Sequence, residues 1–348
     1  MTDPTLPPTM SAPAIEWESV PCPLCGGTDS KFELRAGDLY CGLPGEFTFG
    51  RCQSCGHVFL NPRPTPATIG LCYPADYLQH QPQASSDTPS APGTPDAGRP
   101  WYARPPFRFI PGLRAFGRFV FDEGQHRIPE PPPGAAPPRA LELGCAIGSF
   151  LRRLQQQGWE VEGLEPAEPA AAKARAEGLR VQTGLVENAE FPPATFDAIF
   201  AWMVVEHLHD PSGTLAKVRD ALKPGGVFCF SVPNAGAWER HAFGRYWMGY
   251  DAPRHLQQFT PRTIRRLLTA AGFHRIAIHH QRNIRYVFGS LAEWRLTRRP
   301  DSRWGRTLAA WYRSDPPRWF HLLAFPFAWG LSLIGQGGRL TIVARRPE

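Results

Sequence analysis

Four cysteines stand in two pairs whose spacing is typical of a metal site. The segments CPLCGG and RCQSCG contain Cys22, Cys25, Cys52 and Cys55, and a glycine follows each pair. Such a glycine lets backbone amides turn toward the thiolates, and four thiolates satisfy the tetrahedral coordination of Zn²⁺. Because four protein ligands leave no open position, the zinc ion is expected to be structural. Two disulfide bonds are the alternative, but MTDPTLPPTM lacks the pattern of a secretion signal, which favours a reducing compartment.

A second stretch, LELGCAIGSF, has the composition of a nucleotide-binding loop. The dinucleotide pattern G-x-G-x-x-G would need glycine where the chain has Ala146 and Ser149. The pattern acid-x-Gly-x-Gly-x-Gly fits better, with Glu142, Gly144 and Gly148 in place and Ala146 as one conservative change. An acid this close to the loop would repel a pyrophosphate. The stretch therefore favours a phosphate-free, positively charged nucleoside, S-adenosylmethionine.

A second acid supports this interpretation. Glu165 ends the apolar segment WEVEGLEP, where it could accept both hydroxyls of a ribose. Either Glu142 or Glu165 alone could simply be a solvated strand end. Both together, at this spacing, favour a nucleoside site.

The elements that must position these residues alternate from residue 139 onward. Apolar segments at 139–143, 159–166, 180–184, 196–202 and 227–234 are separated by helical patterns, and 274–280 and 339–346 read as two further strands. Such alternation predicts an α/β fold with a doubly wound, mostly parallel seven-stranded sheet. The last two strands lack a simple helix between them, so they could pair antiparallel. Thr260 followed by Pro261 predicts a helix start.

The chain divides by composition. Of its 39 prolines among 348 residues, 25 lie in the first 140 residues. We expect a disordered start (1–17), a small zinc-ribbon-like module (18–80), a Pro-rich linker with a short basic-aromatic helix (81–138), and the α/β domain (139–348). Within that domain, residues 281–338 are expected to form a helical, basic-aromatic insertion before the last strand.

Several motifs occur in a familiar order, namely ELGCAIG, LEP, FDAIFAWMVVEHLHDP, LKPGGVFCFSVPN and PRHLQQFTPRTIRRLLTAAGF. This set resembles the class I S-adenosylmethionine-dependent methyltransferases of the ubiquinone/menaquinone-methyltransferase-like superfamily. The resemblance covers about residues 139–273 and implies a Rossmann-like fold. The cysteine segment resembles zinc-binding regions found before methyltransferase domains, some of them in bacterial sugar or glycan methyltransferases. These motifs are specific for fold and cofactor, and much less so for substrate.

The resemblance implies a set of cofactor-binding residues, namely Glu142, Gly144, Ala146, Gly148, Glu165, Leu185, Val186 and Trp202. The glycine loop would line the methionyl and adenosine moieties, and Glu165 would bind the ribose. Leu185 and Val186 would flank the adenine, and Trp202 would close the site. The family often has an acid where this chain has Leu185, so adenine recognition would rest on backbone groups.

Methyl transfer is an in-line displacement at an electrophilic carbon, so positioning supplies much of the catalysis. A base is needed if the acceptor carries a proton. His207 and His255 can take up a proton near neutral pH, and Tyr250 is a further candidate. His207 could instead orient a partner by a hydrogen bond, and His255 could anchor the loop ahead of Thr260.

A metal-assisted mechanism receives less support from the sequence. Ubiquinone-type O-methyltransferases place Glu-x-x-Glu-His after the fourth strand to bind a divalent metal ion. This chain has Met203 in place of the first Glu, leaving Glu206 and His207. Two ligands would make a weak magnesium site.

The net charge of +7 is concentrated at the end of the chain, where twelve Arg after residue 280 face four acids. This basic, aromatic segment could lie on a membrane surface, hold a lipid-linked phosphate, or simply cover the sheet.

We expect a cytoplasmic methyltransferase acting on a small-molecule, sugar, glycan or lipid-linked acceptor, with peripheral membrane contact as an option. A quinone- or polyketide-type O-methyltransferase is the alternative, and an inactive cofactor-binding scaffold another. A zinc-ribbon nucleic-acid-binding protein is a third, but the zinc module lacks a basic stripe, so no specific nucleic acid is expected. The oligomeric state stays open.

Overall fold

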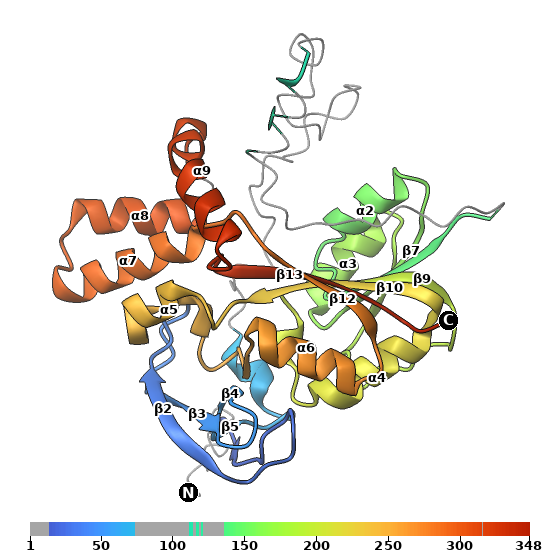
Figure 1. The fold of residues 1–348 in the computed structure, drawn as a ribbon, viewed down its shortest axis with the longest axis horizontal. Coiled ribbons are helices and arrows are strands. Elements are labelled where there is room, and N and C mark those ends of the chain that lie inside the picture. The colour runs from blue at the N-terminus through green and yellow to red at the C-terminus, as the bar shows by residue number, and fades with distance from the viewer. Residues whose placement is uncertain (1–13, 74–110, 114–115, 118–119, 121–135, 315) are drawn as a thin grey trace, which may run out of the picture.

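The computed structural model describes residues 14–73, 111–113, 116–117, 120, 136–314 and 316–348 (Figure 1). The Pro-rich start of the chain and nearly all of the predicted linker with its basic-aromatic helix lie outside the described residues. The described parts are an α/β domain, a small module formed by the N-terminal strands, and a group of three helices near the C-terminus (Figure 1).

The α/β domain is built on a seven-stranded sheet in the order β12-β13-β10-β9-β6-β7-β8. The strands are β6 (Arg139–Leu143), β7 (Glu160–Glu165), β8 (Arg180–Thr183), β9 (Phe196–Trp202), β10 (Leu222–Pro233), β12 (His274–His280) and β13 (Arg339–Arg345). The five strands from β10 to β8 in this order are parallel, whereas β13 pairs antiparallel with both β10 and β12. The predicted mostly parallel seven-stranded sheet is confirmed, and so is its antiparallel pair.

Helices cover both faces of this sheet because its strands are apolar on both sides. The helices are α2 (Ser149–Gln155), α3 (Glu168–Ala176), α4 (Pro211–Ala221) and α6 (Pro261–Ala270). Ala140 packs with the first two helices, and the next residue, Leu141, packs with the last two. This alternation produces the doubly wound arrangement. The predicted start of α6 is also present, since Thr260 forms a capping box with Thr263.

The N-terminal module consists of short strands around the cysteine pairs. Its elements are β1 (Trp17–Glu18), β2 (Ser30–Ala36), β3 (Phe47–Cys52), β4 (Val58–Leu60), β5 (Arg63–Pro64) and η1 (Ile69–Cys72). A fourth strand of its main sheet comes from the α/β domain, because β11 (Gln257–Gln258) pairs antiparallel with β4. The module and the domain therefore share a sheet.

A buried ion-pair group also joins the module to the domain. The guanidinium of Arg254 donates to both carboxylate oxygens of Asp38, at 2.5 and 2.9 Å, and to Asp251 at 2.6 Å. Asp38 in turn accepts backbone N–H groups from its own loop, including that of Tyr40. All three charged side chains are closed off from solvent. Such groups must stay together, because a lone buried charge is costly.

The remaining helices follow β9, β10 and β12. They are η5 (Val205–His207), α5 (Trp238–Phe243), η6 (Gly244–Tyr246), η7 (Met248–Tyr250), α7 (Arg285–Arg298), α8 (Arg303–Arg313) and α9 (Arg318–Leu333). The predicted helical segment 281–338 thus contains α7, α8 and α9. The last of these projects away from the sheet (Figure 1). Within the described ranges, each helix is too short or too polar to cross a lipid bilayer.

Candidate functional site

The loop between β6 and α2 adopts a left-handed turn at three alternate positions. Gly144, Ala146 and Gly148 have φ values of +68°, +47° and +78°. A Cβ atom on Gly144 would lie 2.6 Å from the side chain of Val204, and one on Gly148 would lie 2.2 Å from that of Leu179. Ala146 is half-buried and accommodates its methyl group at a backbone cost of about 1 kcal/mol. The loop therefore tolerates a side chain at only one of the three positions, and that is where the sequence has one.

Glu165 fixes this loop from the end of β7. Its Oε2 accepts the backbone N–H of Ala146 at 2.8 Å, and its Oε1 accepts that of Ala167 at 2.9 Å. A carboxylate has about four acceptor positions, so two are left for a ligand. The predicted role in binding ribose hydroxyls is compatible with this geometry.

Glu142 lies next to this loop, on β6. It is buried, and its Oε2 atom has no hydrogen-bond partner in the described part of the chain. Burial, and then the charge of Glu165, raise the pKa of Glu142 well above its usual range. A nearby positive charge would oppose both effects and stabilise the ionised carboxylate. A loop of small residues beside such a carboxyl group fits a cationic nucleoside such as S-adenosylmethionine.

The other predicted cofactor residues lie at the same edge of the sheet. Leu185 and Val186 follow β8, where Leu185 is exposed and Val186 is buried. Trp202 ends β9 and packs edge-to-face on Phe150 at 5.1 Å between ring centroids. The carboxyl ends of the parallel strands therefore gather all of these positions, which is where α/β sheets bind ligands. Their individual contacts with the cofactor remain predictions.

A buried polar cluster borders the loop. Gly144 of the loop contacts Val204, and η5, which contains part of the cluster, begins at the next residue. Glu206 and His207 are part of η5, and His255 joins them from the segment before β11. The two imidazole rings lie 4.6 Å apart, nearly perpendicular to each other. The fold thus brings together both histidines that the sequence singled out.

The hydrogen bonds of the two histidines assign their tautomers. Nδ1 of His207 lies 3.1 Å from the carbonyl oxygen of Arg254 and 2.9 Å from the hydroxyl of Tyr73. Nδ1 of His255 lies 2.9 Å from the carbonyl oxygen of Gly249. A carbonyl oxygen only accepts hydrogen bonds, so each Nδ1 carries the proton and each Nε2 carries a lone pair.

Acidic side chains face the Nε2 atom of His255. Oδ2 of Asp251 is 3.6 Å away, and Oε1 of Glu206 is 3.9 Å away. Burial raises the pKa of Glu206 to about 8. Burial, and then the neighbouring His255, lower the pKa of His207 to about 3. Both changes favour uncharged groups, so His207 is in its proton-accepting form at neutral pH.

Tyr250, the third candidate base, lies apart from this cluster. Its hydroxyl accepts a hydrogen bond from Arg240 at 2.8 Å, and its ring packs on Phe49 of the module. Burial raises its pKa to about 12. Tyr73, which no sequence motif indicates, is the tyrosine that contacts His207. No local spacing relates Tyr73 to His207, because only the docked module brings them together.

The same cluster could also hold a cation. Among the described residues, Glu206, His207 and His255 each offer a ligand atom, and these atoms lie within 4.8 Å of one another. Only Glu206 and His207 are indicated by the sequence motif, because His255 is distant along the chain. Met203 therefore does not leave the cluster with just two ligands.

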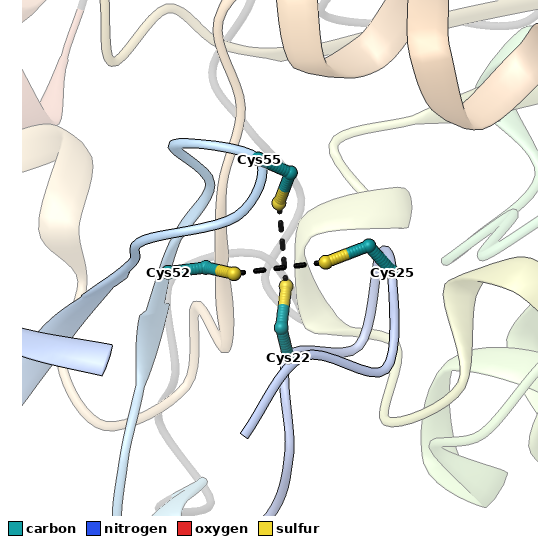
Figure 2. Close-up of side chains that lie close together, drawn as sticks. All are labelled: Cys22, Cys25, Cys52 and Cys55. Atoms are coloured by element: carbon teal, nitrogen blue, oxygen red, sulfur yellow. Dashed lines mark hydrogen bonds between the residues drawn. The ribbon is translucent and has the colours of Figure 1, made fainter. Parts of the chain in front are cut away.

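The four cysteines of the module point toward a common centre (Figure 2). Sγ of Cys22 lies 3.5 Å from that of Cys55, and Sγ of Cys25 lies 3.6 Å from that of Cys52. Zinc bound to four thiolates at about 2.3 Å would separate the sulfur atoms by about 3.8 Å. All four cysteines are free of disulfide bonds. The arrangement is compatible with a structural zinc ion and places it beside β4, which pairs with β11 of the domain.

Comparison with known proteins agrees with this geometry. Residues 116–278 match the family described as "Methyltransferase domain". Malonyl-[acyl-carrier protein] O-methyltransferase of Serratia marcescens is 31% identical over 138 residues, which are 39% of this chain and 53% of that protein. Ubiquinone biosynthesis O-methyltransferase of Idiomarina loihiensis is 28% identical over 156 residues, which are 40% of this chain and 63% of that protein.

Solved structures of methyltransferases are also similar. A crystal structure of an S-adenosylmethionine-dependent methyltransferase from Mesorhizobium loti is 20% identical, with a TM-score of 0.41 over 62% of this chain and 93% of that one.

The chain spans between about half and two thirds of the length of the two curated relatives above. The family match covers the glycine loop, Glu165 and the histidine cluster. Over residues 116–278 the chain is therefore similar to S-adenosylmethionine-dependent methyltransferases.

Proposed function

We propose that the chain transfers a methyl group from S-adenosylmethionine to a small-molecule, sugar, glycan or lipid-linked acceptor. The observation that carries this proposal is the neutral histidine cluster directly beside the glycine loop. A loop alone would fit any cofactor-binding protein, including an inactive scaffold. A proton acceptor within reach of that loop is what an acceptor hydroxyl or amine would need.

S-adenosylmethionine supplies an electrophilic methyl group on a sulfonium ion. The loop from Gly144 to Gly148 and the carboxylate of Glu165 would hold the cofactor in place. His207, which is half-buried, would take the acceptor proton on Nε2. The negative charge of Asp251 would stabilise the resulting imidazolium, whereas the neighbouring His255 acts against it. Tyr73 and the carbonyl of Arg254 would hold the ring of His207 through Nδ1 and leave Nε2 as its proton-accepting atom.

A sugar or glycan acceptor is favoured by the cysteine module, whose motif resembles regions that precede such methyltransferases. A quinone-type O-methyltransferase is the second candidate, favoured by the three potential metal ligands and by relatives named ubiquinone biosynthesis O-methyltransferase. Metal-assisted transfer to a quinol predicts a rate that rises with added Mg²⁺. Transfer with His207 as the base predicts no response to added Mg²⁺.

Replacing His207 with alanine is expected to slow methyl transfer by at least about 10²-fold, the usual lower range for losing a general base. The binding of S-adenosylmethionine should be unchanged. The measurement follows isotope-labelled methyl groups from the cofactor to a panel of nucleotide sugars, lipid-linked sugars and quinols. His209→Ala is the matched control, since that histidine bonds to the carbonyl of Pro64, outside the cluster. Equal rates in the two variants would remove His207 from the mechanism, and no product with any acceptor would favour an inactive scaffold.

Replacing Glu165 with alanine should weaken S-adenosylmethionine binding by roughly 1–3 kcal/mol, because charged hydrogen bonds are lost. The loop also loses the acceptor for the N–H of Ala146, which adds to the effect. Titration calorimetry would measure the change. Glu160→Ala, on the same strand but in partly exposed ion pairs with Arg139 and Arg180, is the control and should bind normally. Unchanged affinity in the Glu165 variant would exclude this residue from the site.

A further inference from the structure

Helix α9 presents an apolar face to solvent. Its large exposed side chains are Trp319, Leu322, Leu323, Phe327, Trp329 and Leu333, and Ile334 follows directly. At 3.6 residues per turn these positions cover roughly 160° of the helix circumference, so they share one broad face of the helix. Leu323 is 72% exposed and Trp319 is 56% exposed. Scattered apolar side chains on a surface are ordinary, but a contiguous face of this size marks an interaction site.

The opposite face of α9 already has partners. Phe320 packs on Phe288 of α7 at 5.0 Å and on Trp311 of α8 at 4.8 Å between ring centroids. Ala328 is buried. The helix is therefore held in place by α7 and α8 through one side, and on the other side Phe327 also contacts Trp238 of α5, at 6.4 Å between ring centroids.

The charge beside this face is positive. Helix α8, whose Trp311 also contacts Trp319, carries Arg303, Arg306 and Arg313 on its exposed surface. The sequences of α8 and α9 contain no Asp or Glu. A second copy of the chain on this face would bring two sets of arginines together, which disfavours self-association. An anionic partner would be attracted instead.

The length of α9 fits a helix that lies on a bilayer and does not cross it. Its 16 residues span about 24 Å, less than the roughly 30 Å of a hydrocarbon core. Exposed tryptophans are the side chains that favour the headgroup region, and α8 adds a third in Trp304.

We propose that α9 docks the chain on an anionic lipid surface. The apolar face of α9 lies in the boundary between headgroups and acyl chains, and the arginines of α8 face the anionic headgroups. This contact is independent of methyl transfer, since none of these residues belongs to the glycine loop or the histidine cluster. It would place the enzyme at the surface where lipid-linked acceptors are found.

The test is co-sedimentation of the full chain with vesicles of phosphatidylcholine, with and without phosphatidylglycerol. The wild-type chain is expected to bind the anionic vesicles at low salt. Neutral lipid or high salt removes the attraction between the arginines and the headgroups. The loss of each such attraction should lower vesicle binding by roughly fivefold. Leu323→Glu should lower partitioning by at least about tenfold, because a buried leucine is replaced by a charge that the lipid repels.

The matched control is Phe32→Glu, which makes the same kind of change at a side chain 65% exposed on β2 of the module. It should bind vesicles like the wild type. Both variants should melt like the wild type, because neither side chain is part of the core. The proposal is overturned by no binding to anionic vesicles, by equal binding of the Leu323 variant, or by a dimer in solution that only the Leu323 variant dissociates.

Discussion

Replacing Cys52 with serine is expected to release a zinc ion and unfold the N-terminal module. Binding of structural zinc to small peptides contributes on the order of 10–16 kcal/mol, which exceeds what a module of this size gains from its own core. Elemental analysis should find one zinc per chain in the wild type and almost none in the variant. Hydrogen exchange should show that β2, β3 and β4 lose protection.

Cys41→Ser is the control for this change, since Cys41 is exposed and lies outside the four-cysteine cluster. It should keep both the metal and the stability of the wild type. If Cys52→Ser melts like Cys41→Ser and neither chain contains zinc, the cluster is not a zinc site. The expected unfolding also reaches the domain, because β11 loses the strand with which it pairs.

Replacing Arg254 with methionine is expected to destabilise the fold by about 3–5 kcal/mol, the range for removing one partner of a buried ion pair. Asp38 and Asp251 would then be left facing each other, buried and alike in charge. Chemical denaturation followed by tryptophan fluorescence would measure the loss. Adding Asp38→Asn should recover part of it, because one of the two uncompensated charges disappears.

Arg245→Met is the matched control, because Arg245 forms an ion pair with Glu46 that also links the domain to the module. That pair is about half exposed on both sides, so its loss should cost at most about 1 kcal/mol. A loss in the Arg254 variant no larger than in this control would contradict the idea that the buried group holds the module in place.

Features encoded by neighbouring residues were predictable from the sequence. The strand and helix alternation from residue 139 gave the sheet, and Thr260 with Pro261 gave the start of α6. The cysteine pairs indicated their cluster because the spacing within each pair already constrains the turn. The glycine loop was predictable for the same reason, down to the one position where a methyl group fits. Each of these features depends on contacts a few residues apart.

Features that depend on contacts between distant segments could not be read in this way. His255 joins Glu206 and His207 only because its loop is held between β11 and the buried Arg254. Tyr73 reaches His207 only because the module docks. Tyr250 resembled a catalytic residue in the sequence, yet its hydroxyl is bonded to Arg240 in the packing under the module. Local sequence patterns predict helices, strands and loops. Contacts between distant segments decide which side chains come together.

The pairing of β11 with β4 limits how this protein could be taken apart or recombined. A chimera that exchanges only residues 18–80 would leave β11 without its partner strand and Arg254 without Asp38. A functional exchange would have to include the segment from about 248 to 259 as well, so that both halves of the shared sheet come from one parent. The natural boundary for protein engineering therefore runs through the α/β domain and not through the linker.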